Sequence, residues 1–198
     1  MITSNSRFDF DIITRWIQPR ERVLDLGCGD GDLLLHLIAQ RDVKGYGIER
    51  DVKHVVNCVR NRINVLQIDL EQGLAGFEDK QFDHVVMSLS LQAVRNTDGI
   101  LEEMLRVGRE AVVSFPNFGY WRHRVSIAEG HMPVSDSLPY EWYNTPNVRF
   151  FTMSDFEQLC AKRDIKILER VAFDEDRVIE TDPNNYASVA IYRLGRQD

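Results

Sequence analysis

Val23-Leu24-Asp25-Leu26-Gly27-Cys28-Gly29-Asp30-Gly31 is the most informative stretch of this chain, because it predicts a buried β-strand that runs into a glycine-rich turn. A helix is predicted directly after the turn, over residues 32–40. Glycines at alternate positions let the backbone adopt positive φ angles and approach a ligand closely, and a helix N-terminus offers unpaired N–H groups. Strand, turn and helix together predict a nucleotide-cofactor site.

The spacing of the glycines indicates which kind of cofactor is expected. A dinucleotide fold places its third glycine three residues after the second, where a pyrophosphate sits on the helix N-terminus. Here the pattern is Gly27-x-Gly29-x-Gly31, and Asp25 precedes the first glycine. A carboxylate at that point would repel a pyrophosphate and attract an ammonium group. The alternative is a glycine-rich turn without a ligand.

Two further predicted strands end in carboxylates. Tyr46-Gly47-Ile48-Glu49 places Glu49 about twenty residues past the glycines, where a doubly wound fold carries the acceptor for the ribose hydroxyls. Val65-Leu66-Gln67-Ile68-Asp69 predicts a third strand that ends in Asp69. Ligands of open α/β sheets bind at the carboxyl ends of the strands, so both acids are expected near the glycines. Asp69 could equally cap the segment that follows it.

Predicted helices and strands alternate along most of the chain, a pattern typical of a parallel sheet covered on both faces. Ser154, followed three residues later by Glu157, predicts a capping box at the start of a late helix. We expect an α/β fold with a three-layer, doubly wound sheet of about seven mostly parallel strands. The sequence predicts a single domain over residues 1–198. Further helices are expected at 8–17, 51–62 and 97–107, and further strands at 82–90, 111–115, 165–170 and 187–193.

Residues 117–151 do not follow the alternation. Aromatic residues alternate there with polar residues and prolines over a stretch too long for an ordinary connection. We expect an insertion that forms a lid or a binding surface, since Tyr and Trp are enriched in interface hot spots. A packed loop that buries its own aromatic side chains is the alternative. The residues selected as a partner or acceptor surface are Tyr120, Trp121, Trp142 and Tyr143.

Composition limits the classes of partner. The formal net charge of −7 argues against broad binding to phosphate backbones. Three scattered cysteines form no C-x-x-C pair, and their odd number suits a reducing compartment. The start Met1-Ile2-Thr3-Ser4 lacks the pattern of an export signal, and the apolar runs are too short to span a bilayer. We therefore expect a cytoplasmic protein with no metal site, no nucleic-acid partner and no membrane partner.

The glycine motif resembles motif I of the class I S-adenosylmethionine (SAM) methyltransferases. This resemblance implies a Rossmann-like methyltransferase fold with SAM, or S-adenosylhomocysteine, as its cofactor. It also implies that Asp69 and Leu70 contact the adenine and that the strand ending at Ser88 faces the methionine half. Cys28 is expected to fill space rather than act as a nucleophile. The expected cofactor-binding residues are Asp25, Gly27, Cys28, Gly29, Gly31, Glu49, Arg50, Asp69, Leu70 and Ser88.

Four segments give a narrower resemblance. They are 25–31, Ser88-Leu89-Ser90-Leu91-Gln92, Ser114-Phe115-Pro116-Asn117-Phe118-Gly119-Tyr120-Trp121 and Tyr140-Glu141-Trp142-Tyr143-Asn144-Thr145-Pro146-Asn147. Together they are similar to the MetW family of methionine biosynthesis proteins over nearly the whole chain. The resemblance implies a role in methionine synthesis with the homoserine O-acyltransferase MetX as partner.

Two functions remain open at this point. One is a SAM-binding accessory or regulatory protein that partners and supports the acyltransferase. The other is a SAM-dependent methyltransferase that acts on a small molecule, with the insertion as its lid. His123 and His131 lie in the insertion, but a lone histidine in a loop is more often a surface residue, and no catalytic residue is assigned. The fourth strand ends in Ser-Leu-Ser, which argues against amide and adenine N-methylation, since relatives of that class carry Asn/Asp-Pro-Pro-Tyr.

Overall fold

An eight-stranded sheet runs through the computed structural model, which describes residues 7–196. The N-terminal residues 1–4, which lack the pattern of an export signal, lie outside the described residues. The strand order is β3-β2-β1-β4-β5-β8-β6-β7, and the first five of these strands are parallel. Their bounds are β1 Arg22–Leu26, β2 Lys44–Glu49, β3 Asn64–Gln67, β4 Phe82–Met87 and β5 Gly108–Pro116.

The second half of the sheet is antiparallel. Strand β8 (Val189–Arg196) pairs with β5 on one side and with β6 (Ile165–Asp174) on the other. The chain turns back after Asp174 through Glu175, which has a positive φ of 57°, into the two-residue strand β7 (Arg177–Val178). The Rossmann-like, mostly parallel sheet is therefore confirmed, but it has eight strands rather than the predicted seven.

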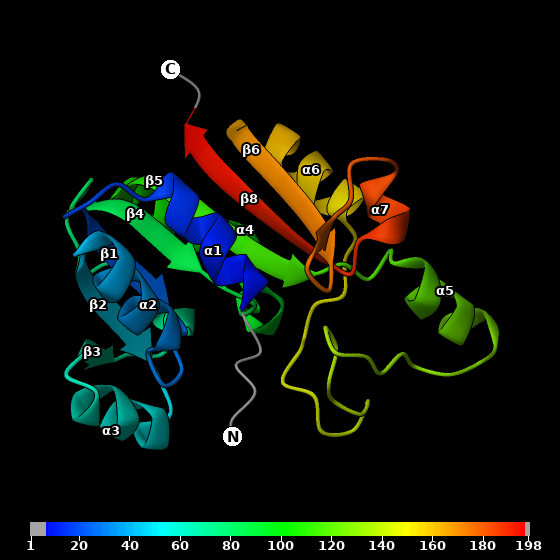
Figure 1. Cartoon of the computed structure of the whole chain (residues 1–198), viewed down its shortest axis with the longest axis horizontal. Helices are drawn as coiled ribbons and strands as arrows, with labels where there is room; N and C mark the ends of the chain where they lie inside the picture. Colours follow the sequence, from blue (N-terminus) through cyan, green and yellow to red (C-terminus); the bar gives the residue numbers. More distant parts are fainter. Residues whose placement is uncertain (1–6, 197–198) are drawn as a thin grey trace.

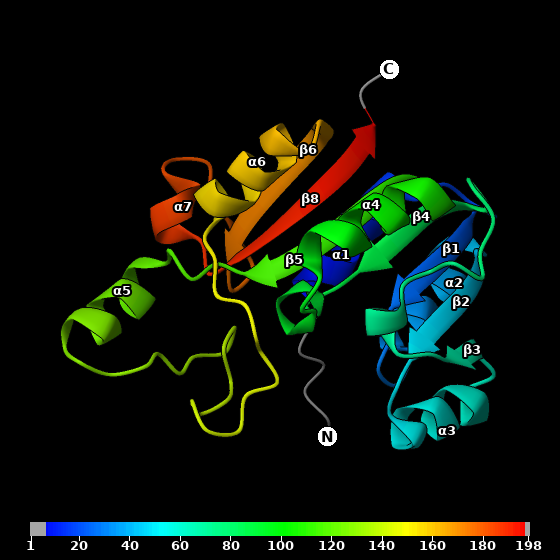
Figure 2. The same cartoon turned by 180° about the vertical axis from the view of Figure 1, so that it is seen from behind.

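Helices cover both faces of the sheet. Figure 1 shows α1 (Phe8–Trp16) and α2 (Asp32–Arg41) on the near face of the sheet. Figure 2, the view from the opposite side, shows α4 (Thr97–Val107) and α6 (Met153–Lys162) on the other face. Helix α3 (Val52–Arg60) lies beside the edge strand β3, while α5 (Trp121–Ala128) and the short α7 (Pro183–Tyr186) lie at the other end. Within residues 7–196, every helix is too short or too polar to span a bilayer.

Side-chain alternation along the strands divides the core into two layers. Leu24 and Val113 pack into the layer under α4 and α6, while their neighbours Val23 and Val112 pack into the layer under α1 and α2. Successive strand residues point to opposite faces, so a strand covered on both sides is apolar at nearly every position. This explains why the apolar runs of the sequence predict the central strands well.

The capping box of α6 lies two residues before the predicted one. Thr152 is the N-cap: its hydroxyl accepts from the Asp155 N–H, and the Asp155 carboxylate accepts from the Thr152 N–H at 2.9 Å. The prediction of Ser154 and Glu157 is wrong. Glu157 instead accepts from the Tyr192 hydroxyl at 2.9 Å and ties α6 to the sheet.

The connection from β3 to β4 lacks an α-helix. It crosses β2 and β1 in the strand order, yet between Gln67 and Phe82 its regular structure is the single 3₁₀ turn η1 (Leu70–Gln72). The other crossovers of the parallel half contain α2, α3 and α4. This side of β2 and β3 therefore has less cover than the rest of the sheet.

Phe115 is expected to be essential to the stability of the antiparallel half. Its ring lies 4.6 Å from that of Phe151, 4.9 Å from that of Phe156 and 5.7 Å from that of Tyr192, between ring centroids. Phe115→Ala should lower the free energy of unfolding by about 3–5 kcal/mol, because it leaves a cavity in a buried cluster. Urea denaturation measures this loss.

The matched control is Phe150→Ala, since Phe150 is 49 % exposed whereas Phe115 is fully buried. Its cost should be below about 1 kcal/mol. Equal losses for the two variants would contradict the assignment of Phe115 to the core.

Candidate functional site

The glycine-rich turn has the backbone geometry that its sequence predicts. Gly27, Gly29 and Gly31 have φ angles of 72°, 55° and 84°. The N–H groups of Gly27 and Cys28 both donate to the carbonyl of Ile48, at 2.8 and 3.0 Å, which fixes the turn against the end of β2. Glycine adopts positive φ angles without strain, and the angles of Gly27 and Gly31 lie outside the small left-handed region that other residues adopt.

The three glycines differ in what surrounds them. A Cβ at Gly27 would lie 3.2 Å from the Ser90 side chain, and one at Gly31 would lie 3.2 Å from the Cys58 Sγ. A Cβ at Gly29 would meet no atom within 4 Å. A Cβ would therefore be crowded at Gly27 and Gly31, whereas Gly29 faces open space in which a ligand can approach the backbone.

Glu49 joins the glycine turn to the start of α3. Its Oε2 accepts from the Gly29 N–H at 3.0 Å, and its Oε1 accepts from the N–H groups of Arg50 and Asp51 at 2.7 and 2.8 Å. The structure thus brings Glu49 beside the glycines, as the spacing predicts. A carboxylate with donors already oriented around it is a preformed acceptor for a hydroxyl group.

Asp25 is a buried carboxyl group at the carboxyl end of β1, with 2 % of its surface exposed. Burial raises the pKa of Asp25 to about 7, and the nearby negative charge of Glu49 adds to the increase. The positive charge of Arg7 opposes it. A buried acid of this kind gains stability from a cationic ligand, which offsets the cost of removing its charge from water.

Arg7 and Asp9 were not among the predicted site residues. The Arg7 guanidinium donates twice to the Asp9 carboxylate, at 2.9 and 2.7 Å, and Ser88 Oγ donates to the same carboxylate at 3.3 Å. The hydrogen bonds to Asp9 raise the pKa of Arg7, and the negative charges of Asp9, Asp32 and Asp25 contribute as well. The start of α1 therefore places a cation near Asp25. No local pattern signals this, because Ser88 is 79 residues from Asp9.

The remaining predicted site residues lie around this edge in different roles. Asp69 caps η1 by accepting from the Glu71 N–H at 3.1 Å, so its expected alternative role is confirmed, and its carboxylate lies 3.8 Å from the Arg50 guanidinium. Leu70 packs partly into the core. Burial raises the pKa of the Cys28 thiol, which agrees with a space-filling residue.

Helix α3 contacts the glycine turn with its inner side. The Asp30 carboxylate accepts from the Asn57 side chain at 2.9 Å and lies 2.7 Å from His54 Nδ1. Cys58 Sγ donates to the Gly29 carbonyl at 3.1 Å. Any movement of α3 therefore changes the surroundings of Gly29 and Asp30.

Residues 117–151, here called the arm, lie to one side of the sheet (Figures 1 and 2). Trp142 and Tyr143 are 71 and 70 % exposed, and Trp121 is 42 % exposed. The expectation that Tyr120 contributes to an exposed surface is wrong: its side chain is buried and its hydroxyl donates to Asp174 at 3.0 Å. Tyr120 fastens the arm to the sheet.

His123 is also buried rather than exposed, because it lies on the inner side of α5 and not in a loop. Its Nδ1 lies 3.2 Å from the Asn117 carbonyl and its Nε2 lies 2.8 Å from Ser135 Oγ. Burial lowers the pKa of His123, which favours the neutral ring. The part of the arm near the sheet is therefore held by hydrogen bonds, whereas Trp142 and Tyr143 at its tip are exposed.

Comparison with solved structures identifies the fold. The chain is similar to a SAM-dependent methyltransferase of Thermotoga maritima, with a TM-score of 0.67 and 17 % identity over 98 % of this chain and 91 % of that one. The fold is the Rossmann-like fold of class I methyltransferases.

Comparison with curated proteins is more specific. The chain is 35 % identical to the bifunctional methionine biosynthesis protein MetXA/MetW of Rhodopirellula baltica, over 96 % of this chain and 33 % of that protein. It is 28 % identical to the ubiquinone/menaquinone biosynthesis C-methyltransferase UbiE of Stenotrophomonas maltophilia, over 66 % of this chain and 60 % of that protein. It thus spans about a third of the first relative and 60 % of the second. Residues 7–194 match the family model described as methionine biosynthesis protein MetW, and this chain belongs to the MetW family.

Proposed function

We propose that this chain is a SAM-binding accessory protein that partners the homoserine O-acyltransferase MetX and supports its activity. The observation that carries the proposal is the Rhodopirellula baltica relative, which joins MetXA and MetW in one protein. Joining two units in one chain holds them at a high effective concentration, which benefits units that work in contact. Two separate proteins need a stable interface for the same effect.

The edge of the sheet around the glycines supports the SAM part of the proposal. The backbone at Gly29 borders open space, Asp25 is a buried carboxyl group, and Glu49 accepts from the Gly29 N–H; we assign Asp25 to the SAM ammonium group and Glu49 to the ribose hydroxyls. The ribose would compete with the Gly29 N–H for Glu49 Oε2. By family resemblance, Asp69 and Leu70 are assigned to the adenine, and Cys28, Gly27, Gly31, Arg50 and Ser88 complete the site.

A regulatory role for SAM follows from chemistry and linkage. SAM is made from methionine, so it reports on the output of the synthesis that the acyltransferase serves. A ligand shifts an association only if it binds the free and partnered forms with different affinities. If SAM changes the affinity of the chain for the acyltransferase by some factor, the acyltransferase must change the affinity of the chain for SAM by the same factor.

Gly29→Ala is expected to weaken SAM binding by about tenfold or more, because the added methyl group would enter the space assigned to the cofactor. Isothermal titration with SAM measures the change. Gly130→Ala in the arm is the matched control: Gly130 also has a positive φ, 88°, and a Cβ there would also meet no atom within 4 Å. Both variants place a methyl group at a position of positive φ, so unchanged affinity in both would contradict the assigned site.

SAM affinity is expected to rise with pH between about 5.5 and about 7.5. Burial raises the pKa of Asp25 to about 7, so the carboxyl group is largely protonated at the acid end of this range. The SAM ammonium favours the ionised form, and binding must therefore release a proton below that pKa. Titration calorimetry in buffers of different ionisation enthalpy detects the released proton.

Asp25→Asn keeps the size of the side chain but cannot titrate. It should bind SAM weakly and with little dependence on pH over the same range. A wild-type affinity that falls as the pH rises would contradict the role given to Asp25.

Adding the chain to the cognate acyltransferase is expected to raise the rate of homoserine acylation. Trp142→Ala combined with Tyr143→Ala should remove most of this stimulation and weaken association about tenfold or more, since both side chains are exposed aromatics at the arm tip. The assay is acyltransferase activity with and without the chain, each with and without SAM. Tyr186→Ala on α7 is the control, because Tyr186 is 49 % exposed outside the arm.

No stimulation, with SAM still bound tightly, would contradict the accessory role and favour a small-molecule methyltransferase. The observation that supports this second function is the similarity to UbiE, which is named as a C-methyltransferase.

A further inference from the structure

Helix α3 presents an apolar stripe to solvent. Val52, Val56 and Val59 follow one another at intervals of four and three residues, which places them on one side of the helix. They are 57, 41 and 63 % exposed, and no other segment of residues 7–196 buries them. A helix on a globular protein normally turns such a stripe to the core. Here the fully buried residue of α3 is Cys58, on the side of the glycine turn.

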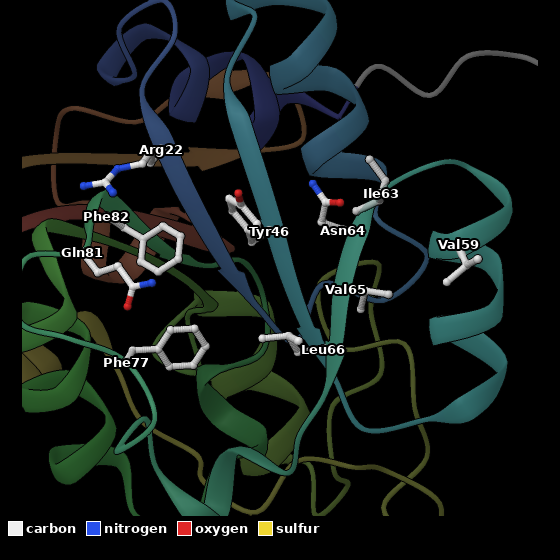
Figure 3. Close-up of a pocket in the computed structure, with 10 residues that line it drawn as sticks. All are labelled: Arg22, Tyr46, Val59, Ile63, Asn64, Val65, Leu66, Phe77, Gln81 and Phe82. Atoms are coloured by element: carbon white, nitrogen blue, oxygen red, sulfur yellow. The ribbon is translucent and has the colours of Figure 1, made fainter.

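Val59, at one end of the stripe, also lines a groove around the edge strand β3. The groove has a volume of about 580 Å³, and Figure 3 shows Tyr46, Phe77 and Phe82 on one side of β3 with Val59 on the other. Tyr46 is 38 % exposed and Leu66, on β3 itself, is 46 % exposed. They are exposed because the β3–β4 connection brings no α-helix over this part of the sheet.

The charge around this surface is opposite to that of the whole chain. Residues 51–69 contain the basic residues Lys53, Arg60 and Arg62 and the acidic residues Asp51 and Asp69, a net charge of +1, although the chain carries a net charge of −7. Arg22 lines the groove as well. Two copies of the chain joined here would bring like charges together, which opposes self-association. The complementary partner is aliphatic at its centre and acidic at its margins.

We propose that the α3 surface, defined as Val52, Val56, Val59, Tyr46 and Leu66, docks an acidic amphipathic helix of the homoserine O-acyltransferase. This inference rests on the proposed function and names a contact additional to the arm. A partner helix would occupy the place left by the missing crossover helix. Its aliphatic face would cover the valine stripe, and its acidic margin would meet Lys53 and Arg60.

The same helix links this surface to the SAM site. On its inner side, α3 holds Gly29 through Cys58 and Asp30 through His54 and Asn57. A partner bound to the outer side of α3 and SAM bound near its inner side would thus both contact or adjoin the same helix. Linkage then requires that each changes the affinity of the other by the same factor.

Val59→Glu tests the apolar part of the surface. It should raise the Kd for the acyltransferase about tenfold or more, because it places a charge in an apolar contact and repels an acidic partner. Val178→Glu on β7 is the control, since Val178 is 45 % exposed and β7 lies at the opposite edge of the sheet from β3. Thermal unfolding should show both variants folded, as expected for exposed positions.

Lys53→Glu combined with Arg60→Glu tests the charge. This double variant should bind the acyltransferase more weakly. Its binding should also depend less on salt concentration, because salt screens the attraction between basic and acidic side chains and this variant no longer has that attraction. Lys162→Glu combined with Lys166→Glu makes the same change in net charge at exposed positions elsewhere and should leave the Kd unchanged.

The outcomes separate the two proposals. If the wild-type chain does not bind the acyltransferase, both fail. If it binds and the Trp142/Tyr143 variant weakens binding while Val59→Glu does not, the α3 surface alone is overturned. A wild-type dimer that Val59→Glu dissociates, measured by light scattering, would identify a second copy as the occupant and would also overturn the inference.

Discussion

The hydrogen bonds accepted by Glu49 hold together the part of the molecule on which its proposed chemistry depends. Three backbone N–H groups, from Gly29, Arg50 and Asp51, converge on this one carboxylate. Charge-assisted bonds of this kind are short and roughly twice as strong as neutral ones. They fix the turn after β1, the end of β2 and the start of α3 relative to one another. Burial is the main cause of the raised pKa of Asp25, and the negative charge of Glu49 adds to it, so Glu49 contributes to both the geometry and the electrostatics of the site.

The sequence predicts the parallel half of the fold well because its signals are local. Apolar runs, glycines and strand-end carboxylates lie within a few residues of the features they specify, and the contact between Gly29 and Glu49 follows from them. The antiparallel half depends on distant partners. Strand β7 is too short to show a pattern, and nothing in the sequence of β8 indicates that it lies between β5 and β6.

The errors at single residues have the same origin. Thr152 with Asp155 and Ser154 with Glu157 are both acceptable capping pairs, and only the structure shows that Glu157 is engaged with Tyr192. In the sequence, Tyr120 cannot be distinguished from the exposed aromatic residues of the arm. In the structure it is buried, and its hydroxyl donates to Asp174, 54 residues away. Arg7 is held at the site because it donates to Asp9, and Asp9 in turn accepts from Ser88. Asp9 and Ser88 are 79 residues apart in the chain. Periodicity carries no information about contacts at such separations.

The position of β8 has a consequence for biosynthesis. Strands β5 and β6 share no pairing, because β8 lies between them although it follows both in the chain. While the ribosome is still making residues 189–196, β6 lacks the strand that joins it to β5, and β5 presents an open edge. Folding of the antiparallel half therefore waits for the last strand to emerge, and until then the open edge is a site at which chaperones can bind or two chains can exchange strands.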